Sequence, residues 1–541
     1  MDFQRIILLF VFGFSVVLLW EAWQKDNRPE SVAMQQSGAQ LVPSRPPTSG
    51  ANQNELPRAG SIPAAGQSNR REKITVRTDL LAIEIDSLGA SINRVQLLKH
   101  RDAANPDQFL ALLDPEFEYA AQSGVIGDGQ PNHRTVWRAL PGVRELTPGL
   151  DRLEVRFSAE TASGSIVEKV YTLHRDSYVI DVRFEAPPDA GAGHAYFQLV
   201  RNQKDPPGQI TMMSTFFGPA FYTEKTAYQK IAFSDIDKGK VALPGETTDG
   251  WIGMVQHYFV SAWLPTPGSV REYYMRKPSD GQYAAGVILP MATTGERIRA
   301  ASQLYVGPQE QGRLKALAPG LDLVVDYGWL TIIAWPLFWL LETFHGWTGN
   351  WGLAIILLTV VIKLVFFPLS AASYKSMAKM KLVGPRLQKL REMYGNDRAK
   401  MNQAMMELYK TEKINPLGGC FPIVVQIPVF IALYWVLLAA IELRHAPFIL
   451  WIKDLSTLDP FFVLPTLMTA TMIIQTRMNP TPPDPVQAKV MAIMPFVFSI
   501  FFFFFPAGLV LYWLVNNVLS ILQQWQIQRI FTRDKPAHGK R

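Results

Sequence analysis

The sequence predicts a polytopic α-helical membrane protein, with a five-span core and an N-terminal anchor, that also carries an all-β sandwich domain. Two patterns in the 541 residues support this prediction. Apolar and polar side chains alternate in short runs between about residues 74 and 300, whereas apolar runs of span length dominate after residue 348. A basic segment between the apolar runs then orients them in the membrane. A chain of this length needs at least two domains.

The composition argues against several kinds of site. The single cysteine, Cys420, excludes an internal disulfide and any multi-cysteine metal site. The eight histidines contain no HExxH pattern, and the chain has no GxxxxGK[ST] motif, so an ATP-driven motor is not indicated. The net charge of +7 falls beside the apolar runs, which favours a membrane over nucleic acid. We therefore expect no metal, no cofactor and no nucleic-acid substrate.

The chain begins with an apolar run, Ile6–Trp20, whose fifteen residues suit either a signal peptide or a short transmembrane anchor. The residues that follow, Glu21–Lys25, are too bulky and charged for a cleavage site, and the nearest candidate, Ser31–Ala33, lies far downstream. We expect an uncleaved anchor. Residues 27–71 are rich in Pro, Ser, Gln, Ala and Gly, which predicts a flexible linker.

A period of two then appears, which predicts an antiparallel sandwich of some 240 residues. Its histidines and carboxylates show no catalytic spacing. A sugar-processing enzyme, one alternative function, would need paired carboxylates or a His/Glu pair in one cleft, so we expect no enzymatic activity. The alternating segments are Ile74–Arg77, Leu80–Ile85, Leu153–Phe157, Val167–Leu173 and Tyr178–Phe184, and the clearest strands are Leu81–Ile85 and Tyr178–Phe184.

The segment Gly328–Phe344 is apolar enough to span a membrane, but Pro336 interrupts it and tryptophans crowd it. Indole rings favour the headgroup level, which predicts a helix lying in the interface. Counting this segment as a span would also place the β domain on the same side of the membrane as the basic segment. The tryptophans are Trp329, Trp335, Trp339 and Trp347.

The apolar run Trp351–Leu369 has nineteen residues, enough to cross a bilayer, yet it contains a lysine. Lys363 lies roughly 9 Å inside the end of this span, and Thr359 lies one helical turn before it. An ammonium deep in hydrocarbon costs about 2.5–3.5 kcal/mol on insertion scales, so it needs water, a partner or a function. The stem of the lysine could reach the headgroups, or the cation could lie in a hydrated cavity.

A polar segment, residues 370–418, follows, and a break at Gly395–Asp397 divides it into the two helices of a hairpin. It has ten basic and four acidic residues, a net charge of +6, and the tail from Ile527 adds +4. The positive-inside rule therefore places the hairpin and the C-terminus in the cytoplasm. Flexible methionines here would suit apolar substrate segments, or they could pack the hairpin against itself. The methionines predicted to dock substrate are Met377, Met380, Met401 and Met405.

Four more apolar runs complete the core, and Pro506–Gly508 supplies the turn between the last two. Six spans in total place both termini in the cytoplasm and the β domain outside it. The four runs are Phe421–Ile441, Pro460–Thr476, Val490–Phe505 and Leu509–Gln526.

Polar side chains within the spans are amides and hydroxyls, and Lys363 is the one charge. Singly, such residues usually form interhelical hydrogen bonds. Several at the depth of an unpaired cation favour a hydrated, positively charged groove that opens to the cytoplasm. A coupled transporter, another alternative function, would need an intramembrane acid or broken helices around an ion site, and neither is evident. The predicted groove residues are Lys363, Thr359, Gln426, Tyr512, Trp513 and Asn516.

Specific motifs make the chain closely resemble the YidC/Oxa family of bacterial membrane protein insertases, in the Gram-negative form with a large periplasmic domain. The resemblance covers the whole length. Its motifs are Met377–Met380, Asn415–Pro422, Ala446–Trp451 with Asp454-Leu455 and Asp459-Pro460, and Phe505–Tyr512.

The resemblance implies an inner-membrane insertase and chaperone that acts alone or with the Sec translocon. It also implies a β-supersandwich similar to galactose-mutarotase-like folds. The implied partners are nascent membrane proteins, the Sec translocon and membrane lipids, and the basic hairpin and tail would suit ribosome or signal recognition components. The family usually has arginine in the groove where this chain has Lys363, so the charge is kept but the planar fork is not.

The predicted parts follow one another along the chain. They are an N-terminal transmembrane anchor (1–26), a flexible linker (27–71), a periplasmic β-sandwich domain (72–320), an interfacial amphipathic helix (321–347), transmembrane span 2 (348–369), a cytoplasmic basic helical hairpin (370–418), transmembrane spans 3–6 (419–526) and a basic cytoplasmic tail (527–541).

Overall fold

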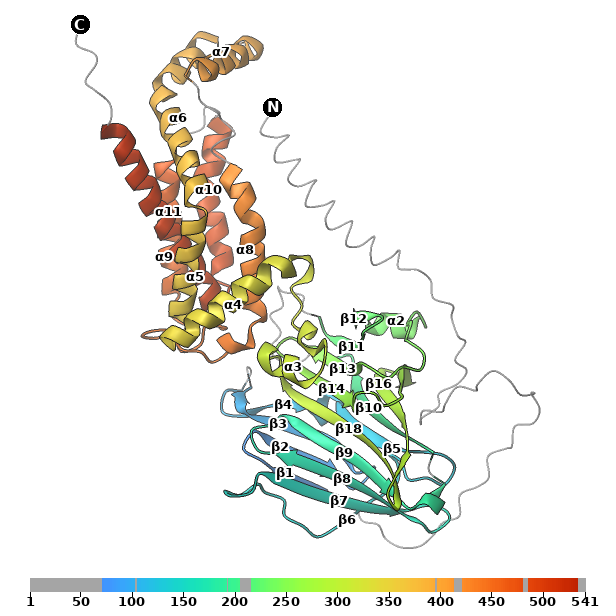
Figure 1. Cartoon of the computed structure of the whole chain (residues 1–541). Coiled ribbons are helices and arrows are strands. Elements are labelled where there is room, and N and C mark those ends of the chain that lie inside the picture. The colour runs from blue at the N-terminus through green and yellow to red at the C-terminus, as the bar shows by residue number, and fades with distance from the viewer. Residues whose placement is uncertain are drawn as a thin grey trace. The chain divides into compact units, whose positions relative to one another are not determined.

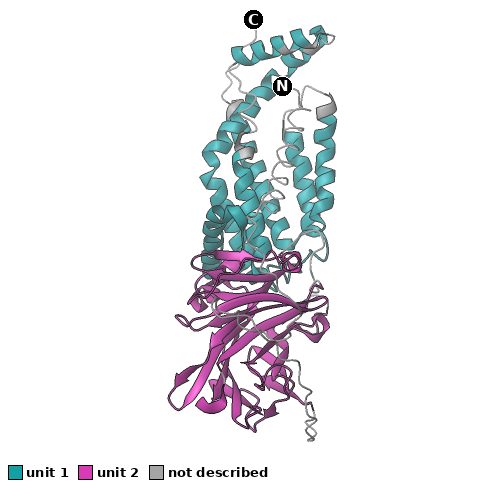
Figure 2. Cartoon of the chain, turned by 90° about the vertical axis from the view of Figure 1, so that its right-hand side faces the viewer, with its two compact units in different colours: residues 1–26, 326–541 teal, residues 27–325 magenta. Residues whose placement is uncertain are grey.

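The computed structural model describes residues 71–102, 105–191, 193–204, 216–394, 397–412, 421–479 and 485–533. The predicted anchor (1–26), the linker up to residue 70 and the end of the tail lie outside the described residues. The described chain forms two compact units, and the boundary between them falls between Val325 and Asp326 (Figure 2). Each unit is considered by itself.

The β unit, coloured magenta in Figure 2, consists of two antiparallel sheets (Figure 1). One has eight strands in the order β1-β2-β3-β5-β10-β16-β15, with β4 paired to β3. Its strands are β1 (Lys73–Arg77), β2 (Leu81–Asp86), β3 (Ser91–Arg101), β4 (Phe109–Leu113), β5 (Ala120–Ile126), β10 (His194–Asn202), β15 (Glu272–Ser279) and β16 (Gln282–Pro290).

The other sheet has ten strands in the order β12-β11-β13-β14-β18-β9-β8-β7-β6, with β17 paired to β18. Two short helices, α2 (Phe233–Asp237) and α3 (Gln311–Leu317), accompany the sheets. The strands are β6 (Arg138–Ala139), β7 (Arg152–Glu160), β8 (Ile166–His174), β9 (Val179–Ala186), β11 (Gly218–Thr223), β12 (Ala227–Lys230), β13 (Trp251–Gln256), β14 (Phe259–Pro265), β17 (Ala292–Thr294) and β18 (Arg297–Pro308).

Aromatic side chains join the two sheets. Phe197 of β10 contacts Phe184 of β9 and Trp263 of β14, with ring centroids 5.7 and 5.2 Å apart. All three side chains are buried, so the core lies between the sheets. Each of the five strands predicted from the alternating pattern overlaps an observed strand, namely β1, β2, β7, β8 and β9.

Two buried cations hold loops of this unit through backbone carbonyls. The Lys169 ammonium donates to the carbonyl oxygens of Gly89 and Ala90 at 3.0 and 2.9 Å, and burial lowers its pKa. The Arg271 guanidinium donates to the carbonyl oxygens of Thr248 and Gly250, both at 3.0 Å. Both side chains are therefore structural, because their donors are committed to backbone carbonyl oxygens.

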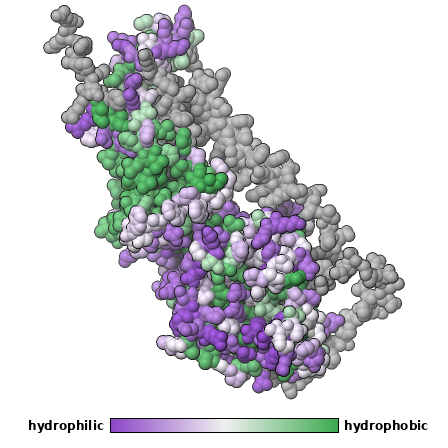
Figure 3. All heavy atoms as spheres, viewed as in Figure 1, coloured by the Kyte–Doolittle hydropathy of each residue, from purple (hydrophilic) through white to green (hydrophobic). Residues whose placement is uncertain are grey.

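The other unit, coloured teal in Figure 2, is helical (Figure 1). Apolar side chains cover much of its helices on the face in Figure 3, whereas polar ones cover α7 and the adjoining end of α6. The helices are α4 (Thr331–Thr348), α5 (Trp351–Val365), α6 (Phe367–Tyr394), α7 (Arg398–Thr411), α8 (Phe421–Ala439), α9 (Val463–Met478), α10 (Pro485–Phe502) and α11 (Ala507–Arg533).

Among the described residues, no single helix is both long and apolar enough to cross a membrane. The bent pair α5 and α6 reaches that length and composition together, and 425–439 and 488–502 are apolar but shorter. The prediction of one continuous helix over Trp351–Leu369 is wrong: α5 ends at Val365, and α6 leaves it at 66°. Pro368 accounts for the break, because its ring would clash with the carbonyl of Leu364 in a continuous helix.

Helix α4 has two unlike faces. One face, including Leu337 and Leu341, is buried, and α4 packs against α5 and α8. The other face exposes Trp335, Trp339 and Trp347. Such an indole-rich face is the pattern predicted for an interfacial helix.

Candidate functional site

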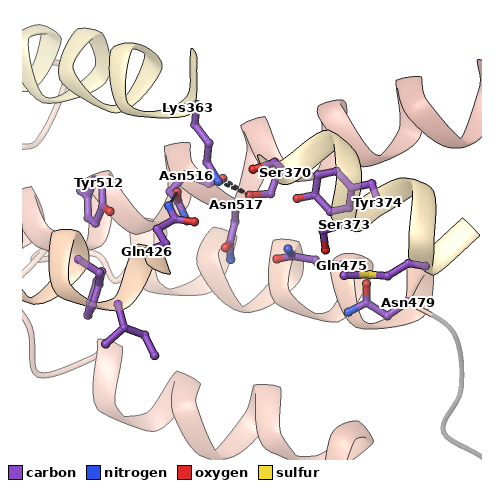
Figure 4. A pocket seen from close by; sticks show the side chains of 14 residues that line it. Lys363, Ser370, Ser373, Tyr374, Gln426, Gln475, Asn479, Tyr512, Asn516 and Asn517 are labelled. Atoms are coloured by element: carbon purple, nitrogen blue, oxygen red, sulfur yellow. Dashed lines mark hydrogen bonds between the residues drawn. The ribbon is translucent and has the colours of Figure 1, made fainter. Parts of the chain in front are cut away.

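A polar cavity of about 270 Å³ lies within the helical unit (Figure 4). Helices α5, α6, α8, α9 and α11 contribute to its wall. The wall carries one cation, Lys363, and no carboxylate. Its carboxamides are Gln426, Gln475, Asn479, Asn516 and Asn517, and its hydroxyls are Ser370, Ser373, Tyr374, Tyr512 and Ser520.

Lys363 extends from the last turn of α5 across the cavity towards α11 (Figure 4). Its side chain is only 5% exposed, and its ammonium donates a hydrogen bond of 2.7 Å to the Ser520 hydroxyl. It forms no ion pair with any carboxylate in the described parts of the chain. This direction favours a cation held in a cavity over a lysine that reaches the headgroups.

Gln426 and Asn516 meet on the wall of the cavity near Lys363 (Figure 4). The Gln426 amide donates to the Asn516 side-chain oxygen at 3.4 Å, which joins α8 to α11. Phe430, one turn after Gln426, stacks on Tyr512 with ring centroids 6.1 Å apart. The structure thus brings together four of the six predicted groove residues: Lys363, Gln426, Tyr512 and Asn516.

The other two predicted groove residues, Thr359 and Trp513, are not on the wall. Thr359 is buried, and its hydroxyl donates to the Ile355 carbonyl at 2.7 Å within its own helix. Trp513 packs between Phe430 and Phe502, with ring centroids 4.5 and 4.7 Å away. Helical spacing placed Thr359 on the face of Lys363, but the cavity begins one turn nearer the end of α5.

The predicted docking methionines occupy different environments. Met377 lines the cavity, whereas Met380 and Met405 pack against the buried pair Val383 and Tyr409 inside the hairpin. For those two, the structure favours the alternative that methionines pack the hairpin against itself. Met401 is half-buried. The methionines that the hairpin exposes most are Met393 and Met406, at 68% and 52%.

Several wall residues were not predicted from the sequence. Ser370, Ser373 and Tyr374 lie beyond Leu369, where the sequence had been assigned to the cytoplasmic hairpin, and the early start of α6 brings them to the cavity. Ser520 lies four residues after Asn516 on α11, so helical periodicity would have placed it on the same face.

The side chains of the wall can form hydrogen bonds with a polar chain in the cavity. Carboxamides and hydroxyls both donate and accept hydrogen bonds, and at about 30 Å³ per molecule the cavity has room for several waters. Among the described residues, no group of three or more His, Cys, Asp or Glu side chains could hold a metal ion. A cation in a polar cavity whose wall has no carboxylate can attract an anionic group of a bound molecule.

Comparisons with known proteins identify the family. The family model "60Kd inner membrane protein" matches residues 343–535, and "YidC periplasmic domain" matches residues 73–340. The membrane protein insertase YidC of Nitrosospira multiformis is 50% identical to this chain, covering 98% of the chain and 97% of the relative. That of Methylobacillus flagellatus is also 50% identical, with the same coverage. The chain belongs to the YidC family of membrane protein insertases.

Membership of the YidC family confirms the resemblance read from the motifs. The residues that match the periplasmic domain are mostly β sheet in the structure, as predicted. The chain is also similar to a solved structure titled "Active YidC insertase crystal structure with the first transmembrane domain resolved", with 18% identity, coverage of 84% of this chain and 92% of that chain, and a TM-score of 0.41. The number of spans and the side on which the termini lie stay predictions.

Proposed function

We propose that this protein inserts and helps to fold membrane proteins, with the α5–α11 cavity receiving the polar flank of a nascent segment. The observation that carries the proposal is Lys363, a buried ammonium in an otherwise neutral wall, with no carboxylate partner among the residues that the structure describes. Such a charge among apolar helices costs free energy rather than stabilising the fold. The Lys363 charge would have a function if the cavity briefly binds an acidic or polar segment of a substrate.

The driving force would come from the substrate. Apolar residues gain several tenths of a kcal/mol each on entering the bilayer, whereas a polar flank must lose water on the way across. The cavity would lower that barrier, because its carboxamides and hydroxyls can replace water around peptide groups. No covalent step is required.

The wider arrangement is part of the same proposal. The core would have five spans after an N-terminal anchor, with both termini cytoplasmic and the β domain periplasmic, in the inner membrane. The protein would work alone or with the Sec translocon, and the basic hairpin would meet ribosomes or signal recognition components. The family relationship and the charge of the hairpin support these points.

Site-specific photocrosslinking during synthesis of a small membrane protein tests the proposal. Photoreactive residues at positions 426 and 374 point at the cavity and leave Lys363 in place. Position 500 on α10 is a matched control, because Ile500 is 63% exposed and outside the wall. We expect the polar flank of the substrate to crosslink to positions 426 and 374 but not to 500. Equal crosslinking at all three positions would contradict a specific groove.

A further inference from the structure

In the part of the chain that the structure describes, the Ser520 side chain accepts a hydrogen bond from the Lys363 ammonium. The two side chains come from α11 and α5, and both are nearly inaccessible, at 4% and 5% exposed. The Ser520 hydroxyl donates in turn to the Asn516 carbonyl oxygen at 2.7 Å, one turn earlier on α11. Tyr374 of α6 lines the same cavity as Ser520.

These contacts fix the direction of the hydroxyl. A serine hydroxyl has one proton and two lone pairs. Because the proton is committed to the Asn516 carbonyl, the lone pairs face outward from α11, and one of them meets Lys363. A back-bonded serine of this kind is held by its own helix and is therefore a rigid acceptor.

A lysine needs such an anchor more than an arginine does. The ammonium is a point charge on a flexible four-carbon stem, whereas the guanidinium fork presents five donors in a fixed plane. Within a cavity of this size, an unanchored ammonium could adopt several positions along the wall. One rigid acceptor limits these positions and keeps the charge where a carboxylate in the cavity can reach it.

We infer that Ser520 is the positioning residue for Lys363 and so sets the preference of the cavity for acidic substrate flanks. This inference rests on the proposed insertase function. It goes beyond that function because it assigns the charge preference to a serine on α11. It also implies that the requirement for Ser520 belongs to lysine at position 363 and weakens when arginine replaces it.

The test uses the full chain in lipid vesicles and two single-span substrates that differ only in the flank to be translocated, with two aspartates or two asparagines. Protease protection measures the insertion of each substrate. The variants are Ser520→Ala, Ser520→Thr, Lys363→Arg, Lys363→Ala, and the double variants of Ser520→Ala with each Lys363 substitution. Ser499→Ala is the matched control, because Ser499 is also buried and bonded to a carbonyl of its own helix but does not line the cavity.

Loss of one charge-assisted hydrogen bond should lower the acidic-to-neutral insertion ratio of Ser520→Ala by about threefold or more. Ser520→Thr keeps the hydroxyl and should retain the ratio, as should Ser499→Ala. Ser520→Ala should add nothing to Lys363→Ala and have a smaller effect in the Lys363→Arg background. An unchanged ratio in Ser520→Ala, or equal loss for both substrates with no rescue by threonine, would overturn the positioning role. If Lys363→Ala itself leaves the ratio unchanged, the proposed function of the cation fails instead.

Discussion

Replacing Lys363 by methionine separates the stability of the helical unit from its function. Methionine keeps an unbranched apolar stem but removes the ammonium and its one described hydrogen bond, to Ser520. If the cation is present for substrates, its removal should impair insertion without harming the fold. If the cation is structural, both should suffer.

The burial and contacts of Lys363 set the magnitudes. A cation at this depth costs about 2.5–3.5 kcal/mol on insertion scales, while a hydrogen bond to a charged group returns about 1.5–3 kcal/mol. We therefore expect the free energy of unfolding of Lys363→Met to equal that of the wild type or exceed it by up to about 2 kcal/mol. An ammonium and a carboxylate 4 Å apart attract by about 4 kcal/mol at an effective dielectric constant of about 20. Even a third of this attraction, realised at the barrier, corresponds to about tenfold in rate.

Thermal unfolding in detergent measures the first quantity, and protease protection of acidic and neutral substrates measures the second. We expect Lys363→Met to unfold no earlier than the wild type and to insert the acidic substrate about tenfold more slowly. Lys363→Arg is the control, because it keeps the charge and should insert both substrates normally. A Lys363→Met protein that unfolds earlier and loses both substrates equally would refute the reasoning.

Four other outcomes can be checked. Deleting residues 72–325 should leave insertion largely intact, because no wall residue comes from the β unit; loss of insertion at normal membrane levels would contradict this. Arg271→Ala should lower the free energy of unfolding of the β unit by about 3 kcal/mol, measured in denaturant, because several loop carbonyls lose their donor. Burial, with Arg134, Arg276 and Lys169 nearby, lowers the pKa of His133 to about 4. As the pH falls from about 6.5 to 4, the unfolded chain therefore binds a proton at His133 before the folded chain does, and the folded state loses stability. His133→Asn should flatten this part of the profile of Tm against pH. Helix α9 has 16 residues and is about 24 Å long, so it would thin the bilayer around it if it spans the membrane. Adding three or four leucines to α9 should then slow insertion, and an unchanged rate would count against thinning.

Sequence periodicity found several strands that are buried on one face and missed two that are buried on both. Strands β7 and β9 alternate between buried and more accessible residues, and both were predicted. Every residue of β13 and β14 is buried, so these strands have no period of two to detect. Central strands of a covered sheet therefore need tertiary information.

The part of the site that was predicted correctly is the part that follows from the depth of each residue in its span and from the helix face on which it lies. Lys363, Gln426 and Asn516 were grouped by their depth in separate spans, and the structure places all three on one wall. The placement of Trp513 was wrong in this respect, because adjacent residues of a helix face different directions and Tyr512 occupies the wall. The contact between Ser520 and Lys363 depends on the packing of α5 against α11, which cannot be predicted from spacing along the sequence.

The break between α5 and α6 explains why a charge can be placed here at all. Lys363 lies two residues before the end of α5, and Pro368 lies in the first turn of α6, where a missing backbone N–H costs nothing. The 66° bend turns the first residues of α6 towards the cavity, so that Ser370 and Ser373 become part of its wall. In a straight helix, the residues beyond Lys363 would continue along the axis of α5 and could not close the cavity from the side. The proline and the lysine therefore act together, because the break adds Ser370 and Ser373 to the polar surroundings of the cation.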